Sequence, residues 1–400
     1  MNVLFLTMNI FTDIEMHNIY SDLMKEFIKH GHRPYIVTPR EKKMAECTEL
    51  VDYEDYSLLK VQIGNTSNVS LIEKGVSTVM LASLFYRAVK RELGHLKFGL
   101  ILYSTPPITL AKPVKKLKKL FKCKTYLMLK DIFPQNAVDL KMLSKNGLIY
   151  KYFRLQEKEL YKESDYIGCM SQANVDYVLR NNPNIVSEKV HVNPNSIEVR
   201  ENIFLDEKKA KIRAQYNIPE NATTFIYGGN LGRPQGISFI IECLKANADK
   251  SDRFFIICGK GTEYIKLESF VNEYNPKNIL LLNELPKAEY EEFVKAFDVG
   301  LVFLDHRFTI PNFPSRILSY MENGMPVLAC TDPCTDIGQV ITEGNFGLWC
   351  ESDAASKFSD CVDKMLLCDL DEFGHNSRKF LIENYSVERC YSIISGKVKI

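Results

Sequence analysis

The chain has 400 residues, of which 46% are hydrophobic and 25% are charged, and its formal net charge at pH 7 is +1. This length exceeds what one hydrophobic core usually serves, so the sequence predicts two domains of about 200 residues each. The balanced charge excludes a globally basic nucleic-acid-binding surface, and no apolar run reaches the roughly 18–20 residues of a membrane-spanning helix. The apolar start, Met1 to Thr7, is too short for a signal peptide and predicts a first strand.

The eleven cysteines are scattered, and none of them forms a Cys-x-x-Cys pair. Several, such as Cys169 and Cys258, lie in apolar runs and are expected to act as small buried hydrophobic residues in a reducing compartment. The closest pair, Cys330 and Cys334, has no histidine cluster beside it. The sequence therefore predicts no metal site there.

Short apolar runs alternate with amphipathic segments along the whole chain. Runs of this kind are typical of parallel strands that are covered on both faces. The segments between them have helix stop signals, as at Met16–Lys29, which is followed by Gly31 and Pro34. The repeated strand–helix order predicts an α/β fold with doubly wound parallel sheets. The expected strands are Val3–Thr7, Tyr35–Thr38, Val61–Gly64, Leu100–Ser104, Tyr126–Leu129, Tyr166–Met170, Val190–Val192, Thr224–Gly228, Phe254–Gly259, Ile279–Asn283, Val299–Leu304, Pro326–Ala329 and Phe346–Trp349.

The strand–helix pattern restarts near residue 203, after the turn-rich segment Asn193–Ile197. We place the linker at about 196–205, between an N-terminal domain, 1–198, and a second domain, 203–375. A helical tail follows at 376–400, and the sequence leaves open whether it packs back onto the first domain. Loops at the carboxyl ends of both sets of strands are expected to form a ligand cleft.

A glycine-rich stretch, Gly228 to Gly236, follows an apolar run and precedes the helix-like segment Ile237–Ala248. Glycines between a strand and a helix let backbone N–H groups approach a phosphate closely, and the helix start adds partial positive charge. The spacing matches neither the dinucleotide-binding fingerprint nor the P-loop. The stretch therefore indicates a nucleotide-diphosphate site, with a tight strand–helix turn as the alternative.

A second signal is Pro314-Ser315-Arg316, in which Pro314 and Ser315 suit the start of a helix that Gly324 ends. Arg316 then lies in the first turn, where the helix dipole disfavours a cation. A bound anion would reverse that preference, whereas the alternative is a solvated arginine.

These motifs, together with Gly259-Lys260-Gly261 after a strand, resemble the family 4 retaining glycosyltransferases of bacterial polysaccharide synthesis. The stretch Asp131 to Asn136 is similar to the Asp-Leu-Trp-Pro-Glu-Ser of the O-antigen and capsule branch. Ser171 and Pro194-Asn195-Ser196 also fall where that family has its Ser and Pro-Asn-Gly elements. The resemblance extends from Met1 to about Tyr385. It implies the GT-B fold, in which two Rossmann-like domains face each other across the active site.

The resemblance also implies an activity. A hexose or N-acetylhexosamine-type sugar would pass from a nucleotide-diphosphate donor, UDP rather than GDP, to a lipid-linked saccharide, without metal or other cofactor. Arg233 and Arg316 would neutralise the leaving diphosphate, and Asp131 would face the acceptor hydroxyl unless it is only a turn residue before Pro134. The donor-binding candidates are Gly229, Asn230, Gly232, Gln235, Gly259, Lys260, Gly261, Pro314, Ser315, Ser319 and Glu322, and the acceptor-side candidates are Lys130, Asn136 and His17.

The sequence departs from the family pattern at several positions. Asn230 and Gln235 replace the usual Arg and Lys of the glycine loop. The two glutamates of the Glu-x7-Glu motif fall on Pro311 and Ser319, and Glu322, one turn later, is the candidate replacement. Lys130 stands where the family has His, and Asn9 to His17 where it has paired glycines. The missing glutamates keep open an inactive transferase-like assembly partner, and a hexosamine 2-epimerase of the same fold is the other alternative.

The segment Lys112 to Lys124 contains seven lysines and no acidic residue. Val114, Leu117, Leu120 and Phe121 form an apolar stripe on the same expected helix. Such a helix would suit an anionic membrane surface near a lipid-linked acceptor, and the alternative is a surface helix that packs its stripe on the sheet. The resemblance therefore predicts a cytoplasmic protein, peripheral at the inner face of the plasma membrane, with no nucleic-acid partner.

Overall fold

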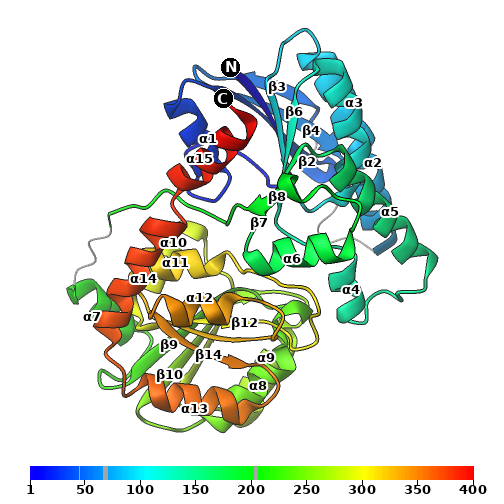
Figure 1. Cartoon of the computed structure of the whole chain (residues 1–400). Coiled ribbons are helices and arrows are strands. Elements are labelled where there is room, and N and C mark those ends of the chain that lie inside the picture. The colour runs from blue at the N-terminus through cyan, green and yellow to red at the C-terminus, as the bar shows by residue number, and fades with distance from the viewer. Residues whose placement is uncertain (45, 66–70, 202–205) are drawn as a thin grey trace. The chain divides into compact units, whose positions relative to one another are not determined.

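The structure is a computed structural model that describes residues 1–44, 46–65, 71–201 and 206–400. The chain divides into two compact units, one formed by Met1–Glu198 with Ser386–Ile400 and the other by Val199–Tyr385 (Figure 1). Each unit contains one mainly parallel sheet with helices against it, which confirms the predicted α/β class.

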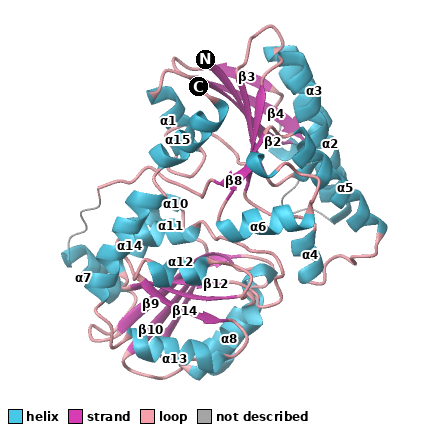
Figure 2. Cartoon of the chain, viewed as in Figure 1, coloured by secondary structure: helices cyan, strands magenta, loops and turns pink. Residues whose placement is uncertain are grey.

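The sheet of the first unit has the strand order β3-β4-β2-β1-β5-β6-β7-β8 and is parallel except for β3. Its strands are β1 (Asn2–Leu6), β2 (Arg33–Glu41), β3 (Glu49–Asp52), β4 (Ser57–Ile63), β5 (Leu100–Ser104), β6 (Lys124–Leu129), β7 (Tyr166–Cys169) and β8 (Val190–Val192). The helices are α1 (Ser21–Lys29), α2 (Leu71–Leu93), α3 (Ala111–Phe121), α4 (Gln135–Asp139), α5 (Leu148–Glu163), α6 (Gln172–Asn181) and α15 (Val387–Val398). Figure 2 shows α1 and α15 on one side of this sheet and α2, α3 and α5 on the other.

The end of the chain belongs to the first unit. Helix α15 packs on α1, where the rings of Phe27 and Tyr391 lie 5.0 Å apart edge to face. The backbone N–H of Val387 donates to the carbonyl of Ile197, so the end of the chain is also joined to the end of the first unit's main segment. The region expected to form one helical tail is thus divided, because the preceding helix, α14 (Leu370–Asn384), lies in the second unit.

The sheet of the second unit has the order β11-β10-β9-β12-β13-β14, and all its strands are parallel. The strands are β9 (Thr223–Asn230), β10 (Arg253–Lys260), β11 (Ile279–Leu282), β12 (Val299–Phe303), β13 (Val327–Thr331) and β14 (Gly347–Glu351). The helices besides α14 are α7 (Asp206–Gln215), α8 (Ile237–Ala246), α9 (Tyr264–Tyr274), α10 (Lys287–Phe293), α11 (Arg316–Glu322), α12 (Ile337–Glu343) and α13 (Ala355–Met365). Stacked rings of Phe225 on β9 and Phe255 on β10, 5.3 Å apart, join these neighbouring strands inside the core.

Every strand expected from the sequence is present, and the differences lie at the ends of elements. The sequence did not predict β3, which is short, lies at an edge of the sheet and has no buried residue. Helix α1 begins at Ser21 rather than Met16, because the side chain of Asn18 accepts hydrogen bonds from the backbone N–H groups of Tyr20 and Ser21. Such a local bond favours a turn over a helix.

The strand order of each sheet reverses direction at one point, between β1 and β5 in the first unit and between β9 and β12 in the second. Ligands of doubly wound sheets bind beyond the carboxyl ends of the strands at this point. The loops after β9 and β12, and those after β1, β5 and β6, are therefore where functional residues are expected.

Candidate functional site

The glycine loop, Gly228 to Gly236, begins in the last residues of β9 and includes a 3-10 turn at Arg233–Gln235. The side-chain oxygen of Gln235 accepts from the Asn230 amide at 3.0 Å and from the backbone N–H of Gly232 at 3.2 Å. The Tyr227 hydroxyl donates to the carbonyl of Asn230 at 2.7 Å. Asn230 and Gln235, expected to bind the donor, thus fix the shape of the loop.

Two loops approach each other so closely that only glycine fits at their contacts. A Cβ at Gly259 would lie 1.9 Å from the carbonyl oxygen of Gly229, and one at Gly261 would lie 2.2 Å from that of Leu231. Both distances are far below contact distance, so Gly259 and Gly261 allow the end of β10 to pack against the glycine loop. The structure gives these two glycines a packing role that the sequence did not suggest.

Arg316 opens α11, as predicted, and its side chain lies against the glycine loop. Its Nη1 donates to the carbonyl of Gly228 at 2.8 Å, and its guanidinium carbon lies 4.2 Å from the ring centroid of Tyr227. A Cβ at Gly229, whose φ is +133°, would lie 3.1 Å from both terminal nitrogens of Arg316. Within the described residues the guanidinium is in no ion pair with a carboxylate, so its charge is available to an anionic ligand.

Tyr320 joins α11 to β9 by hydrogen bonds. Its buried hydroxyl bonds to the carbonyls of Ile226 and Leu301 at 3.2 Å and accepts from the N–H of Gly228 at 3.3 Å. A Cβ at Gly300 would lie only 2.3 Å from the Tyr320 ring. Burial raises the pKa of Tyr320 to about 12, so the hydroxyl stays neutral. Tyr320 lies four residues after Arg316, and no role was predicted for it from the sequence.

Two other predicted cations are paired with carboxylates. Arg233 is 55% exposed, and its Nε lies 3.8 Å from the carboxylate of Glu263. Lys260 is 73% exposed and is bonded to the carboxylate of Glu284. Their side chains are therefore directed by acids on neighbouring loops, and a role for either at the diphosphate stays a prediction.

The loop after β12 was missed by the sequence reasoning. Asp305 accepts from Arg307 at 2.8 and 2.7 Å, and its backbone N–H donates to the carbonyl of Pro234 at 2.9 Å. Burial raises the pKa of Asp305, but the hydrogen bonds from Arg307 outweigh it and hold that pKa below the usual value. This pair clamps the glycine loop at the reversal point of the sheet. The sequence feature that could have indicated this site is Asp305 itself, an acidic residue directly after the apolar run of a strand.

The remaining predictions on α11 concern its start and end. Ser315 precedes the helix but its side chain makes no capping bond, and Ser319 is half-buried one turn after Arg316. The carboxylate of Glu322 accepts from the backbone N–H of Arg200 at 3.2 Å. The observed partner of Glu322 is therefore the backbone at the beginning of the second unit, and its contact with the donor ribose stays a prediction. Pro314, before Ser315, is half-buried.

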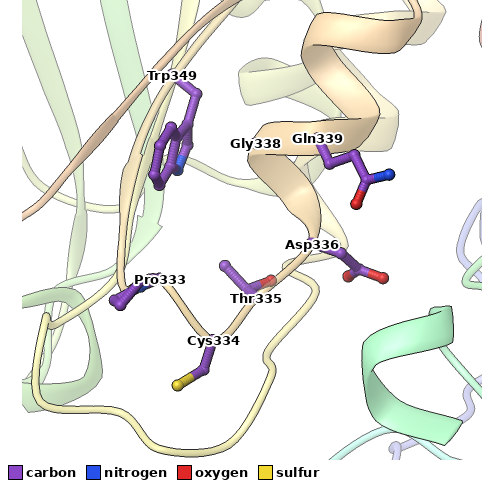
Figure 3. A pocket seen from close by; sticks show the side chains of 7 residues that line it. All are labelled: Pro333, Cys334, Thr335, Asp336, Gly338, Gln339 and Trp349. Atoms are coloured by element: carbon purple, nitrogen blue, oxygen red, sulfur yellow. The ribbon is translucent and has the colours of Figure 1, made fainter. Parts of the chain in front are cut away.

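A pocket of about 330 Å³ lies at the start of α12, beyond the end of β13 (Figure 3). Figure 3 shows Trp349 on one side of the helix start and the polar ends of Asp336 and Gln339 on the other. Thr335 donates to the carbonyl of Asn312 at 2.5 Å, which joins the pocket loop to the segment that carries Arg316. Its lining residues are Pro333, Cys334, Thr335, Asp336, Gly338, Gln339 and Trp349.

In the first unit, Asp131 and Lys130 follow β6 and are braced by Thr105, after β5. The Thr105 hydroxyl oxygen accepts from the backbone N–H groups of Lys130 at 3.0 Å and of Asp131 at 3.2 Å. The Asn136 amide donates to both carboxylate oxygens of Asp131, at 2.9 and 3.1 Å. The structure therefore brings these three predicted residues together at the carboxyl edge of the sheet.

Burial shifts the titration of both charged groups in this cluster. It raises the pKa of Asp131 to about 6, although bonds from the Ile132 backbone and the Asn136 side chain act in the opposite direction. It lowers the pKa of Lys130 to about 8, and the ammonium donates to the carbonyl of Pro194 at 3.4 Å. A carboxyl whose pKa lies just below neutral pH suits a group that exchanges a proton.

His17 lies in the loop after β1, at the same edge of the sheet, with a different partner. Its Nδ1 lies 2.8 Å from the carboxylate of Asp22, which is fully buried near the start of α1. Asp22 also accepts from the backbone N–H of Glu198. The acceptor-side role of His17 therefore stays a prediction, and its observed partner is Asp22.

Comparison with known proteins shows what the second unit is similar to. The family model for glycosyl transferases group 1 matches residues 208–385. The chain is 25% identical over 322 residues to the probable glycosyltransferase WbjE of Pseudomonas aeruginosa, which covers 79% of this chain and 78% of that protein. It is 22% identical over 246 residues to the putative colanic acid biosynthesis glycosyl transferase WcaI of Escherichia coli K12, 60% of this chain and 59% of the relative.

Solved structures agree on the fold. The structure of HepE from Anabaena in complex with UDP covers 100% of both chains with a TM-score of 0.71 at 14% identity. This likeness confirms the expected GT-B fold of two parallel-sheet α/β domains. The family match includes the glycine loop and Arg316 but not Asp131, so the two candidate sites have different support.

We expect Gly229→Ala to lower the affinity for a nucleoside diphosphate by about tenfold or more, because the added Cβ would press on the Arg316 guanidinium at a backbone angle that alanine rarely adopts. Calorimetric titration measures this. Gly324→Ala is the matched control, since Gly324 also has a positive φ, +61°, but its nearest neighbour would be 3.6 Å away. Equal affinity losses in both variants would contradict the account.

We expect Asp131→Asn to stabilise the protein at pH 7.5. The folded-state pKa of about 6 lies above the unfolded value of about 3.9, so the native state binds the proton more tightly. Stability from this group therefore falls as pH rises from about 4 to 6, and the full loss is present above pH 6. Removing the charge should raise the free energy of unfolding by up to about 3 kcal/mol at pH 7.5 and by less at pH 4. Denaturant titration at both pH values measures it, and a destabilised variant at pH 7.5 would refute it.

Proposed function

We propose that the protein transfers a sugar from a nucleotide-diphosphate donor to a saccharide acceptor, because residues 208–385 match the family model for glycosyl transferases group 1. The observation that carries this proposal is Arg316, whose guanidinium is fixed on the glycine loop without a carboxylate partner among the described residues. A cation placed where backbone N–H groups and a glycine allow close approach suits a diphosphate.

In the proposed reaction, the bond between the anomeric carbon and the phosphate oxygen breaks, and a bond to the acceptor oxygen forms. The diphosphate leaves with an added negative charge, which Arg316 stabilises more strongly in the transition state than in the bound donor. Arg233, on the same loop, is proposed to add positive charge when the donor is bound. These two cations make the proposed transfer metal-independent, and the resemblance to retaining enzymes extends the proposal to retention at the anomeric carbon.

Asp131 is proposed to act on the acceptor. Its carboxylate, oriented by Asn136, is charged above a pKa of about 6 and can accept a hydrogen bond or a proton from the acceptor hydroxyl. The adjacent Lys130, with a pKa of about 8, remains charged at neutral pH and suits an anionic group on the acceptor. The first unit would therefore supply the acceptor side of the reaction.

The substrates are proposed from the similar proteins. HepE was solved with UDP, and WcaI is named for colanic acid biosynthesis. We accordingly propose a UDP-linked hexose or N-acetylhexosamine as donor and a lipid-linked saccharide of a surface polysaccharide, such as an O-antigen or capsule, as acceptor. No helix in the described part of the chain has the length and apolar character to span a bilayer, and a peripheral site at the cytoplasmic face is part of the proposal.

Two alternatives differ in their products. A hexosamine 2-epimerase would release the nucleotide or an altered sugar without an acceptor, whereas a transferase needs one. An inactive assembly partner is kept open by Glu322, whose carboxylate is bonded to the backbone of Arg200. Analysis of products formed with and without saccharide acceptor separates the three.

We expect Arg316→Ala to lower kcat by about 100-fold or more, because the variant loses the cation that stabilises the leaving group. Arg316→Lys should recover only part of the rate, since it keeps the charge but loses the planar fork. Lys287→Ala on α10 removes a charge from a side chain paired with Glu291 and serves as the control. Steady-state transfer kinetics measure all three, and a wild-type rate in Arg316→Ala would exclude the assigned site.

Thermal-shift screening tests the proposed nucleotide. A ligand at 100 times its dissociation constant stabilises the fold by about 2.7 kcal/mol. We expect UDP to raise the melting temperature and GDP at the same concentration to have a smaller effect. A larger shift with GDP would overturn the choice of base, and no shift with any nucleoside diphosphate would contradict the donor site.

A further inference from the structure

Helix α5 begins with an apolar stripe that faces solvent. Leu148, Ile149, Tyr152 and Leu155 are 83%, 59%, 40% and 65% exposed, and Met142, in the preceding loop, is 56% exposed. We call these five residues the α5 stripe. Isolated exposed apolar side chains are ordinary on proteins, but a cluster marks an interaction site.

Helical spacing places three residues of the α5 stripe on one face. Leu148, Tyr152 and Leu155 are separated by four and three residues and therefore lie on one face of the helix. The buried residues of α5 are Glu157, Leu160 and Tyr161, in its second half. The helix is thus anchored by its later turns, whereas the apolar side chains of its first two turns are exposed.

Exposed lysines lie beside the α5 stripe. Lys151, Lys158 and Lys162 repeat at helical spacing along one flank, are exposed and are in no ion pair among the described residues. The carboxylates of the same helix are engaged elsewhere. Glu157 bonds to Arg154 and Tyr161, and Glu159 and Glu163 bond to Lys115 of α3. The flank therefore presents positive charge beside an apolar surface.

The lysine-rich helix α3 does not offer a comparable surface. Its apolar residues Val114 and Leu117 are fully buried against the unit. Lys115 and Lys118 pair with Glu159 and Asp165. This packing supports the alternative in which the stripe of Lys112–Lys124 covers the sheet, and it leaves the α5 stripe as the larger exposed apolar cluster of the unit.

We propose that the α5 stripe inserts into the headgroup region of an anionic lipid bilayer, with the flanking lysines at the lipid phosphates. An apolar face bordered by unpaired lysines has the composition of an interfacial membrane helix. A protein partner that covered the stripe would have to supply both an apolar groove and several carboxylates, whereas anionic lipid supplies both chemistries in one surface.

This surface also suits the position of the acceptor site. Helix α4 lies in the sequence between Asp131 and α5, and its Asn136 holds the Asp131 carboxylate. A bilayer at the start of α5 would therefore lie near the residues proposed to meet a lipid-linked acceptor. This consequence for catalysis rests on the proposed function, whereas the membrane contact itself rests on the exposure and charge of α5.

Co-sedimentation of the full-length protein with phosphatidylglycerol-containing vesicles tests the proposal. We expect Leu148→Glu/Leu155→Glu to reduce partitioning at least tenfold. Ile265→Glu/Leu367→Glu, which alters two isolated residues that are 65% and 88% exposed in the second unit, should bind like wild type. Raising the salt should weaken wild-type binding without abolishing it, since salt screens the lysines but not apolar insertion.

Three results would overturn the proposal. The first is equal partitioning of wild type and Leu148→Glu/Leu155→Glu. The second is binding that high salt abolishes, which would reduce the contact to surface charge. The third is a wild-type dimer that the same variant converts to a monomer, which would assign the α5 stripe to a second copy.

The UDP-induced thermal shift, measured on the same proteins, separates this proposal from the proposed function. Leu148→Glu/Leu155→Glu should keep the wild-type shift while losing vesicle binding. Absence of the shift in wild type, with vesicle binding intact, would contradict the donor site and leave the membrane surface supported.

Discussion

The candidate donor site depends on one interaction, the placement of the Arg316 guanidinium on the ring of Tyr227 and the carbonyl of Gly228. A Cβ at position 229 would lie 3.1 Å from the guanidinium nitrogens at a positive φ, and both the tight contact and the backbone strain favour glycine there. The buried hydroxyl of Tyr320 joins α11 to β9 by hydrogen bonds to the backbone of Gly228 and Ile226. These contacts thus join the loop, the helix and the cation to one another.

In the proposed reaction, the second unit stabilises charge and the first unit accepts a proton. The second unit concentrates a fixed cation at the reversal point of its sheet, where a leaving diphosphate would gain charge. The first unit holds a buried carboxyl, Asp131, whose pKa of about 6 reflects a balance between desolvation and the hydrogen bonds of its neighbours. Such a group destabilises the fold when charged, and a functional role explains why that cost persists.

The sequence predicted most of the fold, because buried parallel strands produce apolar runs that need no tertiary information to recognise. It also predicted where Arg316 and Asp131 lie in the fold. Arg316 follows the helix-start residues Pro314 and Ser315, and Asp131 follows the apolar run of a strand. It could not predict that Gln235 braces Asn230, that Asp305 and Arg307 clamp the loop, or that Glu322 bonds to Arg200. Those contacts join residues through tertiary geometry. The exposure of the α5 stripe could not be predicted from the sequence either, since an apolar helical face usually predicts burial.

The central claim is that Arg316 recognises the second phosphate of the donor nucleotide. Calorimetric affinities for UDP and UMP, in wild type and in Arg316→Ala, test it through a thermodynamic cycle. The account predicts that wild type prefers UDP over UMP by about tenfold or more, and that the preference disappears in Arg316→Ala while UMP affinity changes little. An unchanged preference for UDP in the variant would contradict the claim.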